Sequence, residues 1–221
     1  DKAINQSGAF RGGVLDKEVT QDITAETLSI LGIDASQVDK LQDIPFSDLA
    51  DASSKALKKV EAELKAAGKP IMGFGLSWGP SVDGEDLPFQ TASDEALTLS
   101  KDIPLMIGTV KNEFGVFANM RFANASDEQI MAHIKEQYKD KADAYITAVK
   151  KAYPKDTKAI DLLNVDTMFR PGAVAQANQK SMIASGAPVY MYLFTWQSPV
   201  FDGKYMSLHC MELPFVFDNI D

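Results

Sequence analysis

The sequence predicts an α/β fold with a mostly parallel sheet and flanking helices. Two apolar runs carry the prediction, over residues 104–110 and 189–196, because each is short and follows Pro or Gly. The second run is rich in aromatic and β-branched residues, as strands are. Segments whose apolar residues repeat at helical spacing separate the two runs, and this alternation of strands and helices is typical of α/β proteins. We therefore expect residues 104–110 to form a strand that is buried on both faces.

The remaining elements follow from local signals. Residues 3–8 indicate a short strand that runs into a turn, and residues 71–87 are extended chain with turns because Gly and Pro are frequent there. Ser126, followed three residues later by Gln129, predicts a capping box at the start of a helix. Apolar spacing and helix-terminating Gly and Pro predict helices over residues 19–31, 36–41, 47–68, 93–99, 127–138, 140–153, 157–163 and 171–186.

Composition excludes several classes of function. The net charge of −9 argues against a nucleic-acid partner and against docking to an anionic membrane, since both require a basic surface. No apolar run is long enough for a membrane-spanning helix. The single cysteine, Cys210, excludes an intramolecular disulfide, and no Cys/His cluster has zinc-like spacing. We expect neither a metal ion nor a cofactor, and the compartment stays unknown.

The ends of the chain suggest a piece of a longer protein. The sequence opens at Asp1 without an initiator Met and closes directly after an apolar run. We interpret both ends as cuts within one domain, with a processed mature chain as the alternative.

Two chemically capable side chains follow predicted strands. Glu113 comes off the carboxyl end of the run over residues 104–110, and His209 follows the later run after a loop. Ligand-facing residues of open parallel sheets lie beyond the carboxyl ends of strands. Taken singly, such a Glu is most often solvated and such a His is most often bound to a neighbour. Together they are placed as a catalytic acid and base would be.

Four stretches resemble a known family in their order and rough spacing. They are Gln6-Ser7-Gly8, Val82-Asp83-Gly84 with Leu87-Pro88, Gly108-Thr109-Val110-Lys111-Asn112-Glu113, and His209-Cys210-Met211-Glu212-Leu213-Pro214-Phe215-Val216-Phe217. The strand-like Tyr190-Met191-Tyr192-Leu193-Phe194 is also similar to a late strand of that family. The chain resembles the type-B carboxylesterases, which include bacterial para-nitrobenzyl esterases and the cholinesterases. The resemblance implies that residues 1–221 are a partial carboxylesterase domain, the C-terminal portion of an α/β-hydrolase fold truncated at both ends.

The resemblance implies hydrolysis of a small-molecule ester by a Ser-Glu-His triad. Glu113 matches the acid, His209 the base, and Ser7 a serine that hydrogen-bonds the acid. The nucleophile, on a Gly-x-Ser-x-Gly elbow, and the oxyanion loop are expected upstream of Gln6. The isolated chain is therefore expected to be inactive and to self-associate through exposed sheet edges. The alternative is a non-catalytic, cholinesterase-like binding module.

A literal elbow motif occurs elsewhere, at Gly75-Leu76-Ser77-Trp78-Gly79. An elbow requires a strand, a sharp turn and a helix that begins at the nucleophile. Pro80 and the turn at Val82-Asp83-Gly84 leave no room for that helix. We therefore expect Ser77 not to be a nucleophile.

The neighbours of the two candidate residues depart from the family pattern. Phe114 and Cys210 each stand where a glycine is usual. Adjacent residues of extended chain point opposite ways, so we expect Cys210 to be inert rather than paired with the imidazole. Glu212 is expected to be a structural partner for a loop backbone or a basic residue rather than a second acid, and His133 to lie on the surface or its rim. Four apolar residues either line a substrate pocket or pack in the core: Phe114, Phe117, Met120 and Met206.

Overall fold

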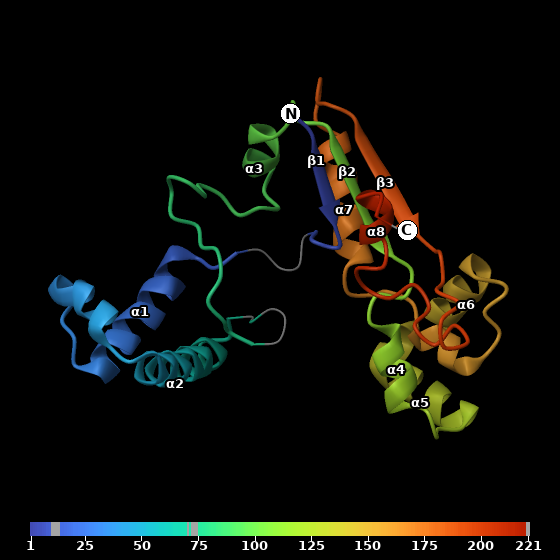
Figure 1. Ribbon diagram of the computed structural model, residues 1–221, viewed down its shortest axis with the longest axis horizontal. Helices are drawn as coiled ribbons and strands as arrows, with labels where there is room; N and C mark the ends of the chain where they lie inside the picture. The colour runs from blue at the N-terminus through green and yellow to red at the C-terminus, as the bar shows by residue number, and fades with distance from the viewer. Residues whose placement is uncertain (10–13, 70, 72–74, 220–221) are drawn as a thin grey trace. The chain divides into compact units, whose positions relative to one another are not determined.

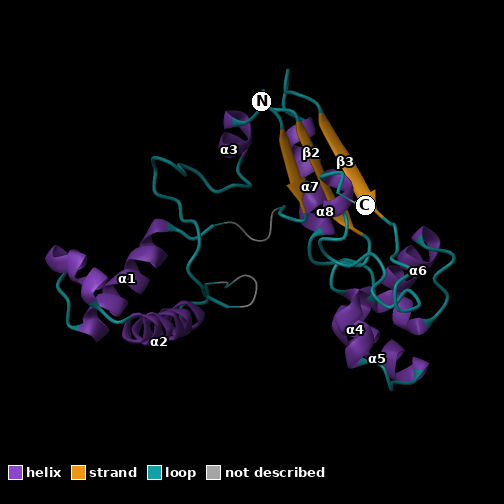
Figure 2. Ribbon diagram, viewed as in Figure 1, coloured by secondary structure: helices purple, strands orange, loops and turns teal. Residues whose placement is uncertain are grey.

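A computed structural model describes residues 1–9, 14–69, 71 and 75–219, and it divides into two compact units. The first unit is Asp1–Ala9 together with Asp102–Asp221, and the second is Phe10–Lys101. The first unit contains the sheet (Figures 1 and 2). Within the described residues, no helix is long and apolar enough to cross a membrane.

Over the described residues, the sheet of the first unit has three parallel strands in the order β1-β2-β3. They are β1 (Ala3–Gln6), β2 (Leu105–Val110) and β3 (Val189–Phe194). Parallel neighbours need long crossover connections, and here the whole second unit lies in the connection from β1 to β2. The predicted strands and their parallel pairing are therefore confirmed.

The helices of the first unit lie in the connection from β2 to β3 and after β3. Their bounds are α4 (Gly115–Arg121), α5 (Asp127–Tyr138), η2 (Lys139–Lys141), α6 (Ala142–Ala152), η3 (Ala159–Leu163), α7 (Arg170–Ser181) and α8 (Leu213–Val216). The capping box of Ser126 and Gln129 is present at the start of α5. The helix predicted over 140–153 is preceded by a 3-10 turn, and the one predicted to reach residue 186 ends at Ser181.

The two faces of the sheet are covered differently. On one face, Leu105 and Ile107 pack against Ala173 and Ala177 of α7. On the opposite face, Phe215 of α8 packs against Phe194, with ring centroids 5.2 Å apart. The start of that face is uncovered, because Ile4, Met106 and Tyr190 lie in register and are 57%, 44% and 59% exposed. Burial on both faces is therefore correct for Ile107–Val110 and wrong at Met106.

The second unit is built around a helix pair. Its helices are α1 (Lys17–Leu31), η1 (Ala35–Asp43), α2 (Phe46–Ala66) and α3 (Asp94–Leu99). The core between α1 and α2 is formed by Ile23, Ala56 and Val60. Gly32 ends α1 in the left-handed conformation, with φ of 66°, which a residue without Cβ adopts at least cost. The helix end predicted at Gly32 is confirmed.

Candidate active site

Glu113 lies three residues after the end of β2, at the turn into α4. Its side chain is one of the largest fully buried ones, with the residue 1% exposed. The backbone φ of Glu113 is +24°, which is unusual for a residue with a Cβ and places backbone strain at this turn. A buried carboxylate requires hydrogen bonds to both oxygens, because desolvation of an unpaired charge costs several kcal/mol.

Both oxygens of Glu113 are bound. Oε1 accepts the Ser7 hydroxyl at 2.6 Å and the Val110 amide N–H at 3.0 Å. Oε2 lies 2.6 Å from Nδ1 of His209. Ser7 follows β1 and is itself buried with φ of +55°. The parallel order of β1 and β2 brings the two strand ends, and thus Ser7 and Glu113, to one edge of the sheet.

The loop that carries His209 is bound to Glu113 through a backbone hydrogen bond as well as through the side chains. The amide of His209 donates to the Glu113 carbonyl at 2.9 Å. Its imidazole stacks on Phe169, with centroids 5.4 Å apart and planes 11° apart, and Phe114 lies 4.9 Å away at 44°. The His209 side chain is 31% exposed. Because Nδ1 is engaged by a carboxylate, Nε2 is the nitrogen left to take up and return a proton.

Glu212 lies close to this pair and is 3% exposed. Its Oε1 accepts the side-chain amide of Gln6 at 3.2 Å, so the expected backbone or basic partner was wrong. Burial, together with the carboxylates of Glu212 and Glu113, raises the pKa of Tyr192 to about 12.

Cys210 is exposed, but its environment disfavours the reactive thiolate. Desolvation first, and then the carboxylates of Glu212 and Glu113, raise the pKa of its thiol above the usual value. Because the thiolate is the nucleophilic form, a raised pKa lowers reactivity near neutral pH. The backbone φ of Cys210 is +71°, the conformation that favours glycine. A glycine at this place in the resembled family fits that backbone.

Most of the four apolar residues that were candidates for a substrate pocket lie at the surface. Phe114, Phe117 and Met120 are 38%, 59% and 63% exposed, so they do not pack in the core. The Phe114 and Phe117 rings lie 5.9 Å apart. Met206 is half-buried, and its sulfur accepts a weak hydrogen bond from Asn119 at 3.8 Å. Phe114 and Phe117 form an apolar wall beside His209.

Two features of the site were missed from the sequence. The helix α4 was not predicted, although Phe117 and Met120 stand three residues apart as on one helix face. Phe169, the ring that stacks on the imidazole, gave no signal, because it lies 40 positions away in the chain and meets His209 only in the folded structure. His133 is half-buried on α5 and packs against Phe122.

Ser77 does not stand on an elbow. Residues 76–80 are irregular chain and no helix begins at Ser77, which is exposed. The neighbouring Leu76 amide donates to Glu61 at 3.0 Å, and the Trp78 indole donates to Ser53 at 2.6 Å. These bonds fix the segment along α2 rather than over a sheet, and the prediction that Ser77 lacks the elbow geometry is confirmed.

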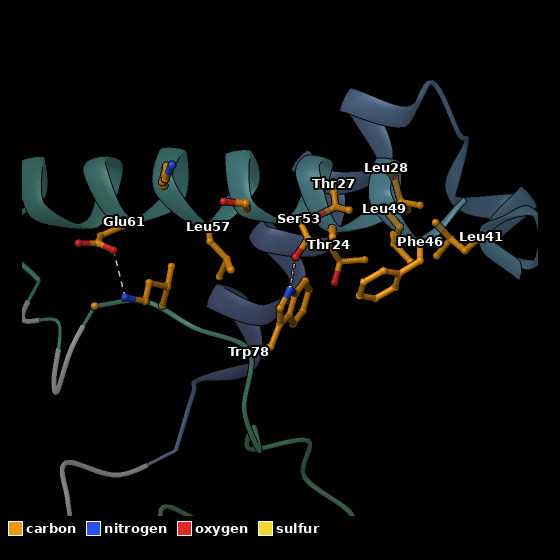
Figure 3. A pocket seen from close by; sticks show the side chains of 15 residues that line it. Thr24, Thr27, Leu28, Leu41, Phe46, Leu49, Ser53, Leu57, Glu61 and Trp78 are labelled. Atoms are coloured by element: carbon orange, nitrogen blue, oxygen red, sulfur yellow. Dashed lines mark hydrogen bonds between the residues drawn. The ribbon is translucent and has the colours of Figure 1, made fainter. Parts of the chain in front are cut away.

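The second unit holds a pocket of about 760 Å³ (Figure 3). It lies between α1, α2 and the Trp78 segment, and neither Glu113 nor His209 lines it. Three of its polar side chains are hydrogen-bonded within the unit: Trp78 donates to Ser53, and Glu61 accepts from the Leu76 amide. Among the described residues, no three His, Cys, Asp or Glu side chains are grouped as a metal site.

Comparison with known proteins gives one consistent match. The sequence profile of the carboxylesterase family matches residues 1–220. The chain is 32% identical to the para-nitrobenzyl esterase of Bacillus subtilis (strain 168), over 100% of this chain and 41% of that protein. It is 26% identical to the phenmedipham hydrolase of Pseudarthrobacter oxydans, over 56% of this chain and 25% of that protein.

Solved structures agree. An esterase from Clostridium hathewayi, described as able to hydrolyse aliphatic aromatic polyesters, matches with a TM-score of 0.62 and 26% identity over 99% of this chain and 41% of that chain. A PNB esterase matches with a TM-score of 0.56 and 29% identity over 100% of this chain and 43% of that chain. The chain thus spans about two fifths of the length of these esterases.

A parallel sheet with flanking helices, shared with these esterases, places the chain in the class of α/β-hydrolase proteins. The extent of the sequence match identifies it further. The chain belongs to the carboxylesterase family.

Proposed function

We propose that this chain is the acid-and-base-bearing part of a serine carboxylesterase with a Ser-Glu-His triad. The observation that carries the proposal is Glu113, which is buried with one oxygen on the Ser7 hydroxyl and the other on His209 Nδ1. A buried carboxylate that holds an imidazole by Nδ1 is the arrangement in which Nε2 acts as a general base. The chain's family membership supports ester hydrolysis as the reaction.

The proposed reaction needs a nucleophilic serine, which we place on an elbow of the longer protein, upstream of residues 1–221. His209 Nε2 takes the proton of that serine as its oxygen bonds to the ester carbonyl carbon. The imidazolium, stabilised by Glu113, then returns the proton to the leaving alcohol oxygen as the acyl–oxygen bond breaks. Water then bonds to the acyl carbon as Nε2 takes its proton, and the imidazolium passes that proton to the serine oxygen as the acyl–serine bond breaks and the carboxylic acid leaves. The substrate is a small-molecule ester whose apolar part rests on the wall of Phe114 and Phe117.

The base is tested in the longer protein that carries these residues. We expect His209→Ala to lower turnover of short-chain p-nitrophenyl esters by about 10⁴-fold or more, as loss of a triad base does elsewhere. His133→Ala is the matched control, because it removes the other histidine of residues 1–221. Unchanged turnover in His209→Ala contradicts the proposal.

The absence of a nucleophile from residues 1–221 has its own test. An active-site-directed fluorophosphonate is expected to leave the isolated chain unlabelled. Labelling at Ser77 or at another serine of the chain contradicts this part of the proposal. A longer protein that carries Glu113 and His209 but no Gly-x-Ser-x-Gly serine upstream would favour a non-catalytic binding module instead.

A further inference from the structure

Asn112, the residue before the proposed acid, joins three segments through one buried side chain. It is 4% exposed. Its Oδ1 accepts the backbone N–H of Ser207 at 3.2 Å, and its Nδ2 donates to the backbone carbonyl of Asn164 at 3.0 Å. The end of β2 is thus bound to the histidine loop on one side and to the turn after η3 on the other.

The contact with Ser207 belongs to a short ladder between two loops. The Asn112 amide donates to the Ser207 carbonyl at 3.2 Å, and the His209 amide donates to the Glu113 carbonyl at 2.9 Å. Ser207 is fully buried, and its hydroxyl donates to the Trp196 carbonyl at 2.5 Å. Ser207 lies two residues before His209 in the chain. Its position therefore constrains where the His209 backbone, and with it the imidazole, can lie.

The side chain must both donate and accept to complete this arrangement. Asp at this position can accept from Ser207 but cannot donate to Asn164 when ionised. Leu, of similar shape, does neither and leaves a buried N–H and a buried carbonyl without partners. Such groups are costly to leave unpaired, so the loops are expected to shift to recover them.

We propose that Asn112 is a positioning residue that holds His209 in register with Glu113. The inference rests on the proposed function, in which His209 is the base. It extends that function to a side chain that touches neither the imidazole nor the substrate. The amide acts through Ser207, and its effect is read at the hydrogen bond between His209 Nδ1 and Glu113 Oε2.

The test uses the chain as it is, with ¹⁵N-labelled histidine and proton NMR. The chain has two histidines, so His133 serves as an internal reference in every spectrum. The wild-type chain is expected to show a slowly exchanging Nδ1 proton on His209. Asn112→Leu is expected to speed its exchange by about tenfold or more, through local opening of the loop. Asn112→Asp, which keeps the acceptor for Ser207 but loses the donor for Asn164, is expected to exchange at a rate between those of the wild type and Asn112→Leu.

Matched controls are Asn178→Leu and Asn178→Asp, which make the same changes on the exposed face of α7 in the same unit. They are expected to leave the His209 proton unchanged. Wild-type exchange in a folded Asn112→Leu chain overturns the positioning role alone and leaves the acid–base pair intact. Absence of the slow proton from the wild type contradicts the pair itself, and the inference with it.

Folding of the variants is checked by circular dichroism and by the His133 signals. If Asn112→Leu does not fold, Asn112→Ala takes its place, with the same faster exchange expected. If neither folds, Asn112 supports the fold in general, and a role specific to His209 is overturned.

Discussion

The hydroxyl of Ser7 donates a 2.6 Å hydrogen bond to Glu113 Oε1, while His209 Nδ1 lies 2.6 Å from the other oxygen of the same carboxylate. The acid is thus held from the ends of two neighbouring strands and from a distant loop. Ser7, Glu113 and Cys210 all have positive φ, so strained backbone is concentrated around this pair.

Loss of the Ser7 hydroxyl is expected to destabilise the chain. Ser7→Ala leaves Oε1 with one donor, and a hydrogen bond to a charged group contributes about 2 kcal/mol. The free energy of unfolding in urea measures the change. Ser185→Ala is the matched control, because Ser185 also has positive φ, of 57°, but is exposed and away from the site. Equal losses in the two variants would mean that the hydroxyl of Ser7 contributes nothing specific.

Replacing Cys210 by glycine is expected to stabilise the fold. The left-handed conformation costs a residue with Cβ roughly 1–2 kcal/mol, which glycine avoids. Part of this gain is offset by the greater freedom of glycine in the unfolded chain. We expect a net increase of about 0.5–1 kcal/mol in the free energy of unfolding. Cys210→Ala, which keeps the strained backbone, is expected to show no such gain, and an equal gain in both variants would disprove the explanation.

The thiol of Cys210 is expected to react slowly for an accessible cysteine. Its pKa is raised, so at pH 8 a smaller fraction is thiolate in the folded chain than in the unfolded one. Disulfide exchange with DTNB should therefore be faster in urea than in buffer, and the difference should shrink as pH rises through the folded pKa. Glu212→Gln removes one carboxylate that raises the pKa and should speed the folded reaction. No acceleration in Glu212→Gln would contradict the electrostatic contribution.

A side chain at Gly108 is expected to disrupt the sheet. A Cβ there would lie 2.3 Å from Cδ1 of Tyr192, the residue paired with Gly108 across β2 and β3. Overpacking of this kind costs about 1–3 kcal/mol, so Gly108→Ala should lower the urea midpoint. Gly79→Ala, whose Cβ would meet nothing within 4 Å, is the control. Tyr192→Leu in the Gly108→Ala background should recover part of the loss if the ring is the obstacle.

Self-association stays a prediction and follows from the sheet edges. Among the described strands, β1 and β3 each have a neighbour on one side only, and Ile4 and Tyr190 are exposed there. We expect sedimentation velocity to show larger species as the concentration of the isolated chain rises. Lysine at an edge opposes such pairing, so Ile4→Lys and Tyr190→Lys should reduce it. Met182→Lys, on an exposed residue outside the sheet, should not, and equal effects of all three would point to net charge instead.

The sequence by itself determined the strands, most of the helices and the two candidate residues. Short apolar runs, the capping box of Ser126 and the stop at Gly32 are local signals, so they could be interpreted without knowledge of distant contacts. Glu113 and His209 were found because each follows a strand and because their neighbouring residues resemble a family.

Only the tertiary structure decided what surrounds them. Phe169 on the imidazole, Gln6 on Glu212 and the Asn112 bridge all join residues far apart in the chain. The exposure of Met106 likewise depends on which layer covers each face of the sheet. Local periodicity predicts which face of one segment is buried. The contacts between distant residues depend instead on how all segments pack together. The physical reason is that hydrogen-bond and ring contacts form between whatever side chains the topology brings within a few ångströms, and spacing along the chain does not encode that distance.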